Sequence, residues 1–429
     1  MTAAAATSTP SPTSSTTNTL SAMQPQPCAK RVTAQALADC GKRLREGNLV
    51  SFPTETVYGL GCHALDESAC RKVFQAKERP LTDPLIVHVN EAADAFKLWN
   101  ATADVDSSDT LAPSLEGRVL TTLCNAFWPG PLTLVAVASN AVPSVVMAGT
   151  GFVAARSPRH DLARALIDAA QVPLAAPSAN KFGHVSPTTA QHVWDDLKYE
   201  DVWILEQQDE PVNDSSPGKG NNNSCNVGVE SSVVKLEMNQ DGTQGTLTVL
   251  RQGAVSVFDL QTAIKEAGLH ESICVVAKSN QRVSEVTATV APGQTIRHYS
   301  PNVPSFLLSP GCVSADYDSV SLKSALKGAV VLDYGRQCEA WRDHVLDYRD
   351  LSATRDSAQA AQWIYESLRW AEQIPGASHI LFAPLESGDD VVEADALMLA
   401  VQDRLMRAAS GVVLESLDAL AVNGSSPAN

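Results

Sequence analysis

Short apolar runs alternate with amphipathic segments from residue 33 onward, and this alternation is the strongest constraint on the fold of the chain. The runs NLVSF, PLIVHV, LTLVAVA, FVAAR, VPLAA, SSVVKL and LTVLR are typical of β-strands. Between them, TAQALADCGKRLREG, DESACRKVFQAK, DLARALIDAA and TTAQHVWDDL have the apolar spacing of helices. Strands that alternate with helices predict an α/β protein.

Single residues mark several helix boundaries. Gly47 can end the first helix. Asp66 can cap the segment 66–77, and Pro80 prevents that helix from continuing. Lys77 continues the apolar face of this helix, so its side chain is expected to leave the helix on the side of the sheet.

The chain is expected to form two domains, because 429 residues exceed the usual size of one hydrophobic core. Residues 1–29 are rich in Ala, Ser, Thr and Pro and carry no charge, so they are expected to be disordered. The first domain is expected at 30–289, a linker at 290–304 and a smaller α/β domain at 305–422. The polar segment 209–224 has the composition of an inserted loop.

Composition narrows the class of protein. The formal net charge is -16, which disfavours nucleic-acid binding. Nine cysteines without a C-x-x-C pair suit reduced thiols in a cytoplasmic protein. No apolar stretch is long enough to span a membrane. The N-terminal segment is Ser-rich but has no arginine, so a cytoplasmic location is expected and a minor mitochondrial pool stays open.

The stretch FPTETVYGLG (52–61) places two threonines directly after an apolar run. Ligands of open α/β sheets lie beyond the carboxyl ends of strands, so polar residues that follow the predicted strands are candidates for one site. Basic groups and hydroxyls that converge in an acidic protein favour a small carboxylate or phosphate. In SPTT (186–189), Ser186 is expected to cap a helix whose free N–H groups also favour an anion. The candidates are Thr54, Thr56, Lys77, Arg79, His88, Arg156, Ser178, Asn180 and Arg251.

Each candidate also has a purely structural explanation. A single lysine such as Lys77 is more often a solvated surface charge. His88 in an apolar strand is more often a hydrogen-bonded core residue. Ser186 would cap its helix with or without an anion, and Gly59 and Gly61 would only permit a tight turn. The convergence of the candidates, rather than any one of them, indicates a site.

The motifs FPTETVYGLG, KERPLTDPLIVHV, WPGPLTL, AAPSAN, GVESSVV and APGQTIRHYSP occur here in the order found in the YrdC-type threonylcarbamoyl-AMP synthases. The chain resembles the two-domain form of this family, strongly over residues 33–301 and more weakly at AVQDRLMRAASG (400–411). The resemblance implies a YrdC-like catalytic domain with a twisted mixed sheet and helices. It also implies a linker that folds over the nucleotide and a smaller Rossmann-like α/β domain.

The resemblance further implies an activity. Enzymes of this family make threonylcarbamoyl-AMP and pyrophosphate from L-threonine, bicarbonate or CO2, and ATP. Mg²⁺ would accompany ATP, and no tightly bound organic cofactor or metal site made by the protein is expected. A tRNA threonylcarbamoyltransferase would use the product to modify tRNA. Direct tRNA binding by this chain is expected to be weak or absent.

The resemblance also assigns roles to residues. Lys77 and Arg79 would be catalytic. His298 would belong, with Arg297 and Tyr299, to the linker that covers the nucleotide. Those implied to hold L-threonine are Thr56, His88, Arg156, Ala176 and Ser231. Those implied to hold ATP are Lys77, Arg79, Asp83, Ser178, Asn180, Ser186, Arg251 and His298.

Three positions depart from the family pattern, in which they are usually Asn, Thr and an aromatic residue: Asp83, Phe152 and Ile296. A carboxylate beside phosphate is unfavourable unless it faces a cation, so the role of Asp83 in particular stays open. A non-catalytic RNA-binding YrdC-like protein is the alternative function, which the net charge disfavours. A carbamoyltransferase of hydrogenase maturation would need zinc fingers and an acylphosphatase domain, for which the chain has no room.

Overall fold

The computed structural model describes residues 26–101, 114–206, 225–277, 289–290, 298–385 and 395–423. Most of the segment expected to be disordered, 1–29, lies outside the described residues. The predicted insertion 209–224, and the linker positions Ile296 and Arg297, also lie outside them.

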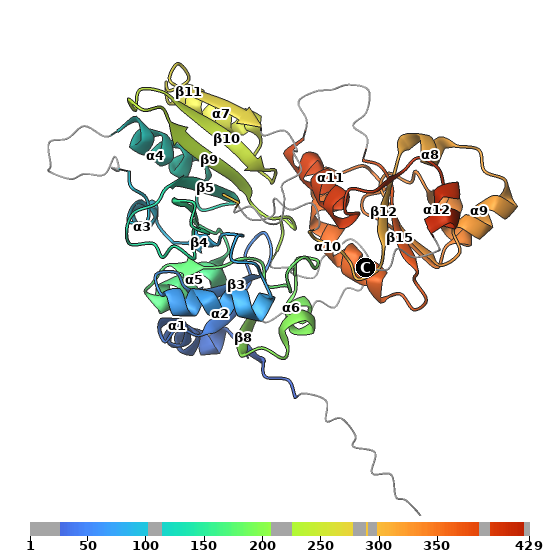
Figure 1. Cartoon of the computed structure of the whole chain (residues 1–429), viewed down its shortest axis with the longest axis horizontal. Helices are drawn as coiled ribbons and strands as arrows, with labels where there is room; N and C mark the ends of the chain where they lie inside the picture. The colour runs from blue at the N-terminus through green and yellow to red at the C-terminus, as the bar shows by residue number, and fades with distance from the viewer. Residues whose placement is uncertain are drawn as a thin grey trace, which may run out of the picture.

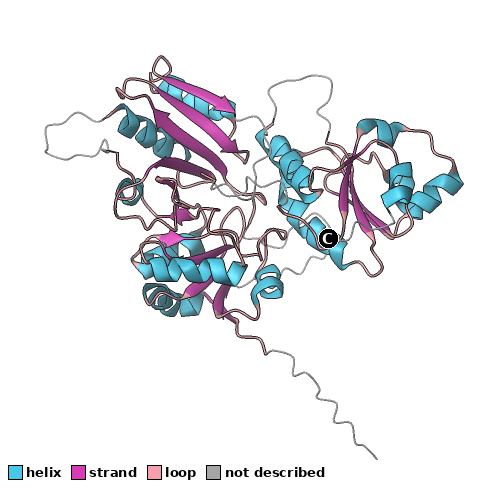
Figure 2. Ribbon diagram, in the orientation of Figure 1, coloured by secondary structure: helices cyan, strands magenta, loops and turns pink. Residues whose placement is uncertain are grey.

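The larger domain is built on a twisted mixed sheet, which confirms the fold class predicted from the sequence (Figures 1 and 2). The described strands follow the order β1-β8-β2-β3-β7-β4-β6-β5-β9-β10-β11, with parallel and antiparallel neighbours. The strands are β1 (Lys30–Thr33), β2 (Leu49–Phe52), β3 (Gly59–His63), β4 (Ile86–His88), β5 (Leu132–Val137), β6 (Phe152–Arg156), β7 (Leu174–Ala175), β8 (Val202–Glu206), β9 (Ser232–Met238), β10 (Gly245–Arg251) and β11 (Ile273–Ala277).

Helices cover both faces of this sheet. Alternate residues of β2 divide between two cores: Val50 and Phe52 pack with α1 and α5, and Leu49 packs with α2 and α6. The helices are α1 (Leu37–Arg45), α2 (Glu67–Lys77), α3 (Ala92–Phe96), α4 (Leu115–Phe127), α5 (Asp161–Ala170), α6 (Ala190–Leu197) and α7 (Val257–Glu266).

The smaller domain has an all-parallel sheet of order β14-β13-β15-β12-β16 within the described residues. Figure 1 shows α10 and α11 on the side of this sheet that faces the larger domain, and α9 and α12 on the other side. Val57, Val185 and Val229 of the larger domain pack into the same core as α10 and α11, so the two domains share apolar contacts. The elements are β12 (Ser305–Leu308), α8 (Pro310–Ser314), α9 (Ser319–Ala325), β13 (Ala329–Asp333), β14 (Asp347–Asp350), α10 (Ser357–Gln373), β15 (His379–Phe382), α11 (Ala396–Ala408), β16 (Val413–Leu414) and α12 (Asp418–Asn423).

The predicted cap of α2 is confirmed, but that of α6 is wrong. The Asp66 side chain accepts hydrogen bonds from the N–H groups of Ser68 and Ala69. Helix α6 instead starts after Thr189, whose hydroxyl accepts from the N–H of His192 at 3.2 Å. Ser186 is three residues too early to cap it, and its hydroxyl hydrogen-bonds a buried carboxylate, a stronger acceptor.

The structural explanation considered for Gly59 and Gly61, a tight turn, does not apply, because both residues lie in β3. A Cβ atom at Gly61 would lie 2.7 Å from Cε1 of Phe52, on the neighbouring strand β2. The glycine is required by this close approach of a ring and not by a turn.

No described helix has both the length and the apolar character that crossing a membrane requires.

Candidate functional site

The loop between β2 and β3 is folded around the hydroxyl of Thr54. Its Oγ1 accepts hydrogen bonds from the backbone N–H groups of Thr56 and Val57, both at 3.2 Å, and donates to the carbonyl oxygen of Val57 at 2.7 Å. These bonds satisfy buried backbone groups that no neighbouring strand pairs with. The Oγ1 atoms of Thr54 and Thr56 lie 2.8 Å apart, and both residues line a pocket. Thr54 therefore braces the loop that presents Thr56.

Arg156, at the end of β6, lines the pocket and contacts three partners. Its Nη1 donates to Oγ1 of Thr56 at 2.9 Å, its Nε donates to the carbonyl oxygen of Gly130 at 3.3 Å, and its Nη2 pairs with Oε1 of Glu55 at 2.7 Å. Burial opposes ionisation of Glu55, but Arg156 lowers the pKa of this carboxyl below its usual value. The planar guanidinium is thereby fixed in one orientation.

Ser231 and Arg251 meet at the ends of β9 and β10. Nε and Nη2 of Arg251 donate to the carbonyl oxygen of Ser231 at 3.1 and 3.0 Å, and Nη2 also lies 3.1 Å from Oγ of Ser231. Oγ of Ser231 is 2.7 Å from Oγ1 of Thr133 on β5. Three neighbouring strands therefore fix the position of one serine hydroxyl in the pocket.

Lys77 is buried and does not line the pocket. Its Nζ donates to the carbonyl oxygens of Ser178, at 2.7 Å, and Asn180. Burial, with a further contribution from Arg79, lowers the pKa of Lys77 well below its usual value. Oγ of Ser178 donates to Oδ1 of Asn180 at 2.6 Å. Lys77 thus holds the loop that presents Ser178 to the pocket.

Arg79 follows α2 after Glu78, whose left-handed backbone (φ 56) ends the helix. Nη2 of Arg79 pairs with Oδ2 of Asp83 at 2.9 Å, and the Nε atom donates to the carbonyl oxygen of Asp83 at 3.0 Å. Burial raises the pKa of Asp83 above its usual value, against the opposing effect of Arg79. The carboxylate of Asp83 therefore faces Arg79. Arg79 lines the pocket and Asp83 does not.

Two pocket histidines are neutral at pH 7. Burial, reinforced by Arg156, lowers the pKa of His88 to about 3, and burial is also the largest effect that lowers the pKa of His298 to about 3. The His298 ring packs edge-on against Tyr299, with centroids 4.1 Å apart. Nδ1 of each histidine has no hydrogen-bond partner within the described part of the chain. A neutral imidazole can donate a hydrogen bond to a ligand or accept one from it.

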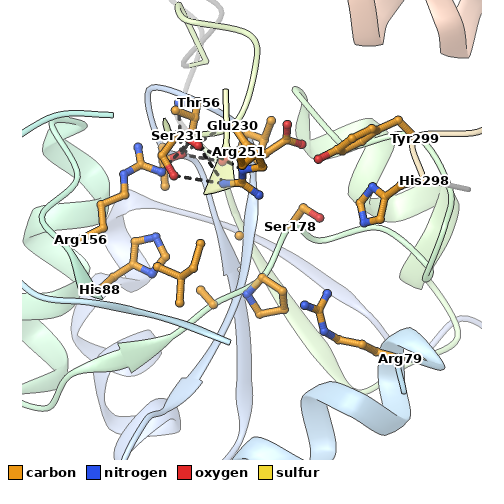
Figure 3. Close-up of a pocket in the computed structure, with 16 residues that line it drawn as sticks. Thr56, Arg79, His88, Arg156, Ser178, Glu230, Ser231, Arg251, His298 and Tyr299 are labelled. Atoms are coloured by element: carbon orange, nitrogen blue, oxygen red, sulfur yellow. Dashed lines mark hydrogen bonds between the residues drawn. The ribbon is translucent and has the colours of Figure 1, made fainter. Parts of the chain in front are cut away.

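Figure 3 shows how the pocket is divided. Arg156 and His88 lie on one side, and Arg79, His298 and Tyr299 lie on the other. Thr56, Ser231 and Arg251 lie between these groups.

The structure brings most of the predicted site residues together. Those that line the pocket are Thr56, Arg79, His88, Arg156, Ala176, Ser178, Ser231, Arg251 and His298. Lys77, Asp83, Asn180 and Ser186 are buried next to these residues without lining the pocket. Phe152, one of the departures from the family pattern, lies away from the pocket under Nζ of Lys235, 3.8 Å from the ring centroid.

Glu230 was not among the site residues predicted from the sequence, and Tyr299 was predicted only as part of the linker. Both residues line the pocket. Glu230 stands between Val229 and Ser231 in GVESS, so its place beside a predicted ligand residue was a usable signal. Tyr299 has φ 59, a left-handed conformation that is uncommon for a bulky residue and that marks a functional or strained position.

The carboxylates around the pocket are already paired with cations. Glu55 pairs with Arg156, Asp83 with Arg79, and Glu230 with Arg404, at 2.7, 2.9 and 3.2 Å. Across the described ranges, no group of three or more His, Cys, Asp or Glu side chains is placed to hold a metal ion.

Two family models match the sequence. Residues 42–217 match the family described as "Telomere recombination", and residues 255–410 match "Threonylcarbamoyl-AMP synthase, C-terminal domain".

Among curated relatives, the threonylcarbamoyl-AMP synthase of Bacillus subtilis is 30% identical over 380 residues, which cover 88% of this chain and 94% of the relative. The synthases of Pyrococcus abyssi and Schizosaccharomyces pombe are 37% and 35% identical, over 60% and 63% of this chain. These two matches span 64% and 62% of the relatives' own lengths, less than two thirds.

Among solved structures, that of P. abyssi Sua5 in complex with L-threonine aligns with a TM-score of 0.67 and 28% identity. The alignment covers 90% of this chain and 98% of the other. The likeness therefore extends over both domains and not only over the larger one.

Proposed function

The chain belongs to the threonylcarbamoyl-AMP synthase family, and from this premise we propose that it makes threonylcarbamoyl-AMP and pyrophosphate from L-threonine, bicarbonate or CO2, and ATP. The observation that carries the proposal is the division of one pocket into two ends, each with one arginine and one neutral histidine. Arg156 and His88 form one end, and Arg79 and His298 form the other. A substrate with a carboxylate at one end and a phosphate at the other fits this arrangement.

L-threonine is proposed to lie at the end formed by Arg156. A fixed guanidinium suits the carboxylate of the amino acid, and the hydroxyls of Thr56 and Ser231 suit its polar groups. The solved P. abyssi relative was obtained with L-threonine, which supports this choice of ligand.

ATP is proposed to place its phosphates toward Arg79 and Arg251. The neutral amine of threonine attacks CO2 and loses a proton, which gives a carbamate. A carbamate oxygen then attacks the α-phosphorus of ATP, the bond from this phosphorus to the β-phosphate bridging oxygen breaks, and pyrophosphate leaves. The protein needs to align the reactants and stabilise negative charge, for which two arginines suffice without a covalent intermediate.

The same proposal includes the metal ion, the linker over the pocket, the enzyme that uses the product and the location of the protein. Mg²⁺ is carried into the site by ATP and shields phosphate charge. His298 and Tyr299 of the linker cover the pocket and exclude water, which would hydrolyse the activated carbamate. A tRNA threonylcarbamoyltransferase takes the product, direct tRNA binding by this chain is weak, and the protein acts in the cytoplasm.

The test is pyrophosphate release by the purified full-length protein with Mg²⁺, and mass spectrometry of the product formed from labelled bicarbonate. Release is expected only when L-threonine, bicarbonate and ATP are all present. Absence of the labelled threonylcarbamoyl-AMP would overturn the proposal.

Variants of α2 and the turn after it give a sharper version of the test. Arg79→Ala removes a charge from the pocket and Lys77→Ala frees the Ser178 loop, so both are expected to lower kcat/KM at least about 100-fold. Arg71→Ala, an exposed arginine of the same helix, is the control and is expected to keep the wild-type rate. Wild-type rates for Lys77→Ala and Arg79→Ala would count against the assigned site.

A further inference from the structure

Glu230 joins the two domains inside the protein. Its Oε1 accepts a hydrogen bond from Oγ of Ser186 in the larger domain, at 2.6 Å. Its Oε2 accepts from the hydroxyl of Tyr365 on α10, at 2.6 Å, and from Nε of Arg404 on α11, at 3.2 Å. Both α10 and α11 belong to the smaller domain. One carboxylate therefore ties three separate segments together.

The partners from the smaller domain are as deeply buried as Glu230 itself. The Arg404 side chain is 0% exposed, and its Nη1 also donates to the carbonyl oxygen of Gln252 at 2.8 Å. Tyr365 packs against Tyr299 of the pocket, with ring centroids 5.5 Å apart. Burial opposes ionisation of Glu230, but Arg404, followed by Arg251, holds its pKa at about 2. The buried carboxylate is thus charged at neutral pH.

The backbone beside Glu230 is pressed directly against α10. Gly228 has φ 76, and a Cβ atom at this position would lie 2.2 Å from the carbonyl oxygen of Ala361. The segment 228–231 therefore runs between α10 on one side and the pocket on the other. Movement of α10 relative to this segment would be transmitted to Ser231, which follows Glu230 and receives the hydrogen bonds of Arg251.

We propose that Glu230 is a positioning residue, through which Tyr365 and Arg404 of the smaller domain hold Ser231 and Arg251 in the geometry that binds L-threonine. This inference rests on the proposed function and deepens it. It gives the smaller domain a defined part in substrate binding, because two of its side chains hold the carboxylate of Glu230, which lines the pocket. Glu230 does not take part in the chemistry.

The physical basis is the high cost of removing one partner from a buried ion pair. Replacing Glu230 by glutamine removes the negative charge that pairs with Arg404 and that Arg251 also stabilises, and leaves Arg404 with its ion pair to Asp403 at 3.2 Å. The segment 228–231 is then expected to shift, and the shift displaces the Ser231 hydroxyl. Tyr365→Phe is milder, because it removes one hydroxyl and keeps the ring that packs on Tyr299.

The experiment measures L-threonine binding by calorimetry, and KM and kcat by pyrophosphate release, for the full-length protein and four variants. Glu230→Gln is expected to raise the dissociation constant for L-threonine about 10-fold or more, the usual effect of losing a hydrogen bond to a charged group. Tyr365→Phe is expected to raise it about 3-fold or more. In both variants KM for L-threonine should change more than kcat. The double variant should bind as Glu230→Gln does, because both changes act through one contact.

The fourth variant, Glu366→Gln, is the matched control. Glu366 lies on α10 and its Oε2 pairs with Nε2 of His192 at 3.1 Å across the same domain interface, but neither residue lines the pocket. This variant is expected to bind L-threonine with the wild-type dissociation constant.

The outcomes separate the inference from the proposed function. A wild-type protein that releases no pyrophosphate with L-threonine overturns the proposed function, and this inference with it. An active wild type with unchanged L-threonine binding in Glu230→Gln and Tyr365→Phe overturns the inference alone. Equal weakening by Glu366→Gln, or additive effects in the double variant, also overturns it, because the effect would then belong to the interface in general.

Discussion

Nη1 of Arg156 donates a hydrogen bond to Oγ1 of Thr56 over 2.9 Å, across a sequence distance of 100 residues. The contact brings the loop after β2 against the end of β6 and fixes a guanidinium at the wall of the pocket.

Arg156→Lys is expected to raise KM for L-threonine about 10-fold to 100-fold. A single ammonium group cannot reach Thr56, Glu55 and the carbonyl oxygen of Gly130 together, so the side chain loses its fixed orientation. Steady-state kinetics with varied L-threonine check this. Arg159→Lys, at an exposed arginine outside the pocket lining, is the control, and an unchanged KM in Arg156→Lys would contradict the prediction.

Asp83→Asn is expected to lower KM for ATP a few-fold. The Asp83 carboxylate pairs with Arg79 at 2.9 Å and offsets positive charge that would otherwise act on the phosphates. Asparagine keeps an oxygen acceptor for Arg79 and removes the negative charge. Kinetics with varied ATP measure the effect, and a higher KM in Asp83→Asn would show that the ion pair is needed to orient Arg79.

His184 is expected to stabilise the contact between the domains up to alkaline pH. Its Nδ1 lies 2.9 Å from Oδ2 of Asp196, and its Nε2 lies 3.0 Å from Oε1 of Glu372 on α10. Burial alone would lower the pKa of His184, but these two carboxylates raise it to about 9. Because the folded pKa exceeds the unfolded value, this stabilisation is complete below about pH 6.5 and is lost as the pH rises through 9.

Urea unfolding of the wild type and of His184→Gln between pH 6 and about pH 10 measures this effect. The difference in the free energy of unfolding is expected to shrink by up to about 3 kcal/mol over this range. A difference that stays constant with pH would contradict the assignment of a protonated His184.

Gly61→Ala is expected to destabilise the protein by about 1–3 kcal/mol. The new methyl group would lie 2.7 Å from Cε1 of Phe52 and 3.1 Å from the carbonyl oxygen of Val50, within a buried strand pair. Gly311→Ala in α8 is the control, since its Cβ atom would meet nothing nearer than 3.9 Å. The denaturation midpoints of the two variants measure the effect, and equal stability of the two variants would contradict the prediction.

Much of the fold could be predicted from local sequence. Asp66 was identified as a cap because a capping carboxylate acts on backbone groups within three residues. The burial of Lys77 followed from its place on the apolar face of α2. The apolar runs gave strands such as β5, β6 and β9 because their pattern repeats every second residue or is continuously apolar.

The predictions failed where partners distant in the sequence decided the outcome. The local sequence predicts Ser186 as a helix cap, but its hydroxyl instead donates a hydrogen bond to the buried carboxylate of Glu230. Gly61 reads as a turn residue, but the ring of Phe52 on the neighbouring strand requires it. Lys77 was predicted to act in the pocket, but its ammonium group donates to the carbonyl oxygens of Ser178 and Asn180 and does not line the pocket.

Hydrophobic periodicity and capping act over a few residues, so the α/β class and the polar residues that follow the strands could be predicted from the sequence. Which of these residues share a pocket, and which charges neutralise each other, depends on how the elements pack in three dimensions. Pairs such as Arg79 with Asp83 and Glu230 with Arg404 show this, because a buried charge takes its partner from whatever the packing of elements brings within about 4 Å.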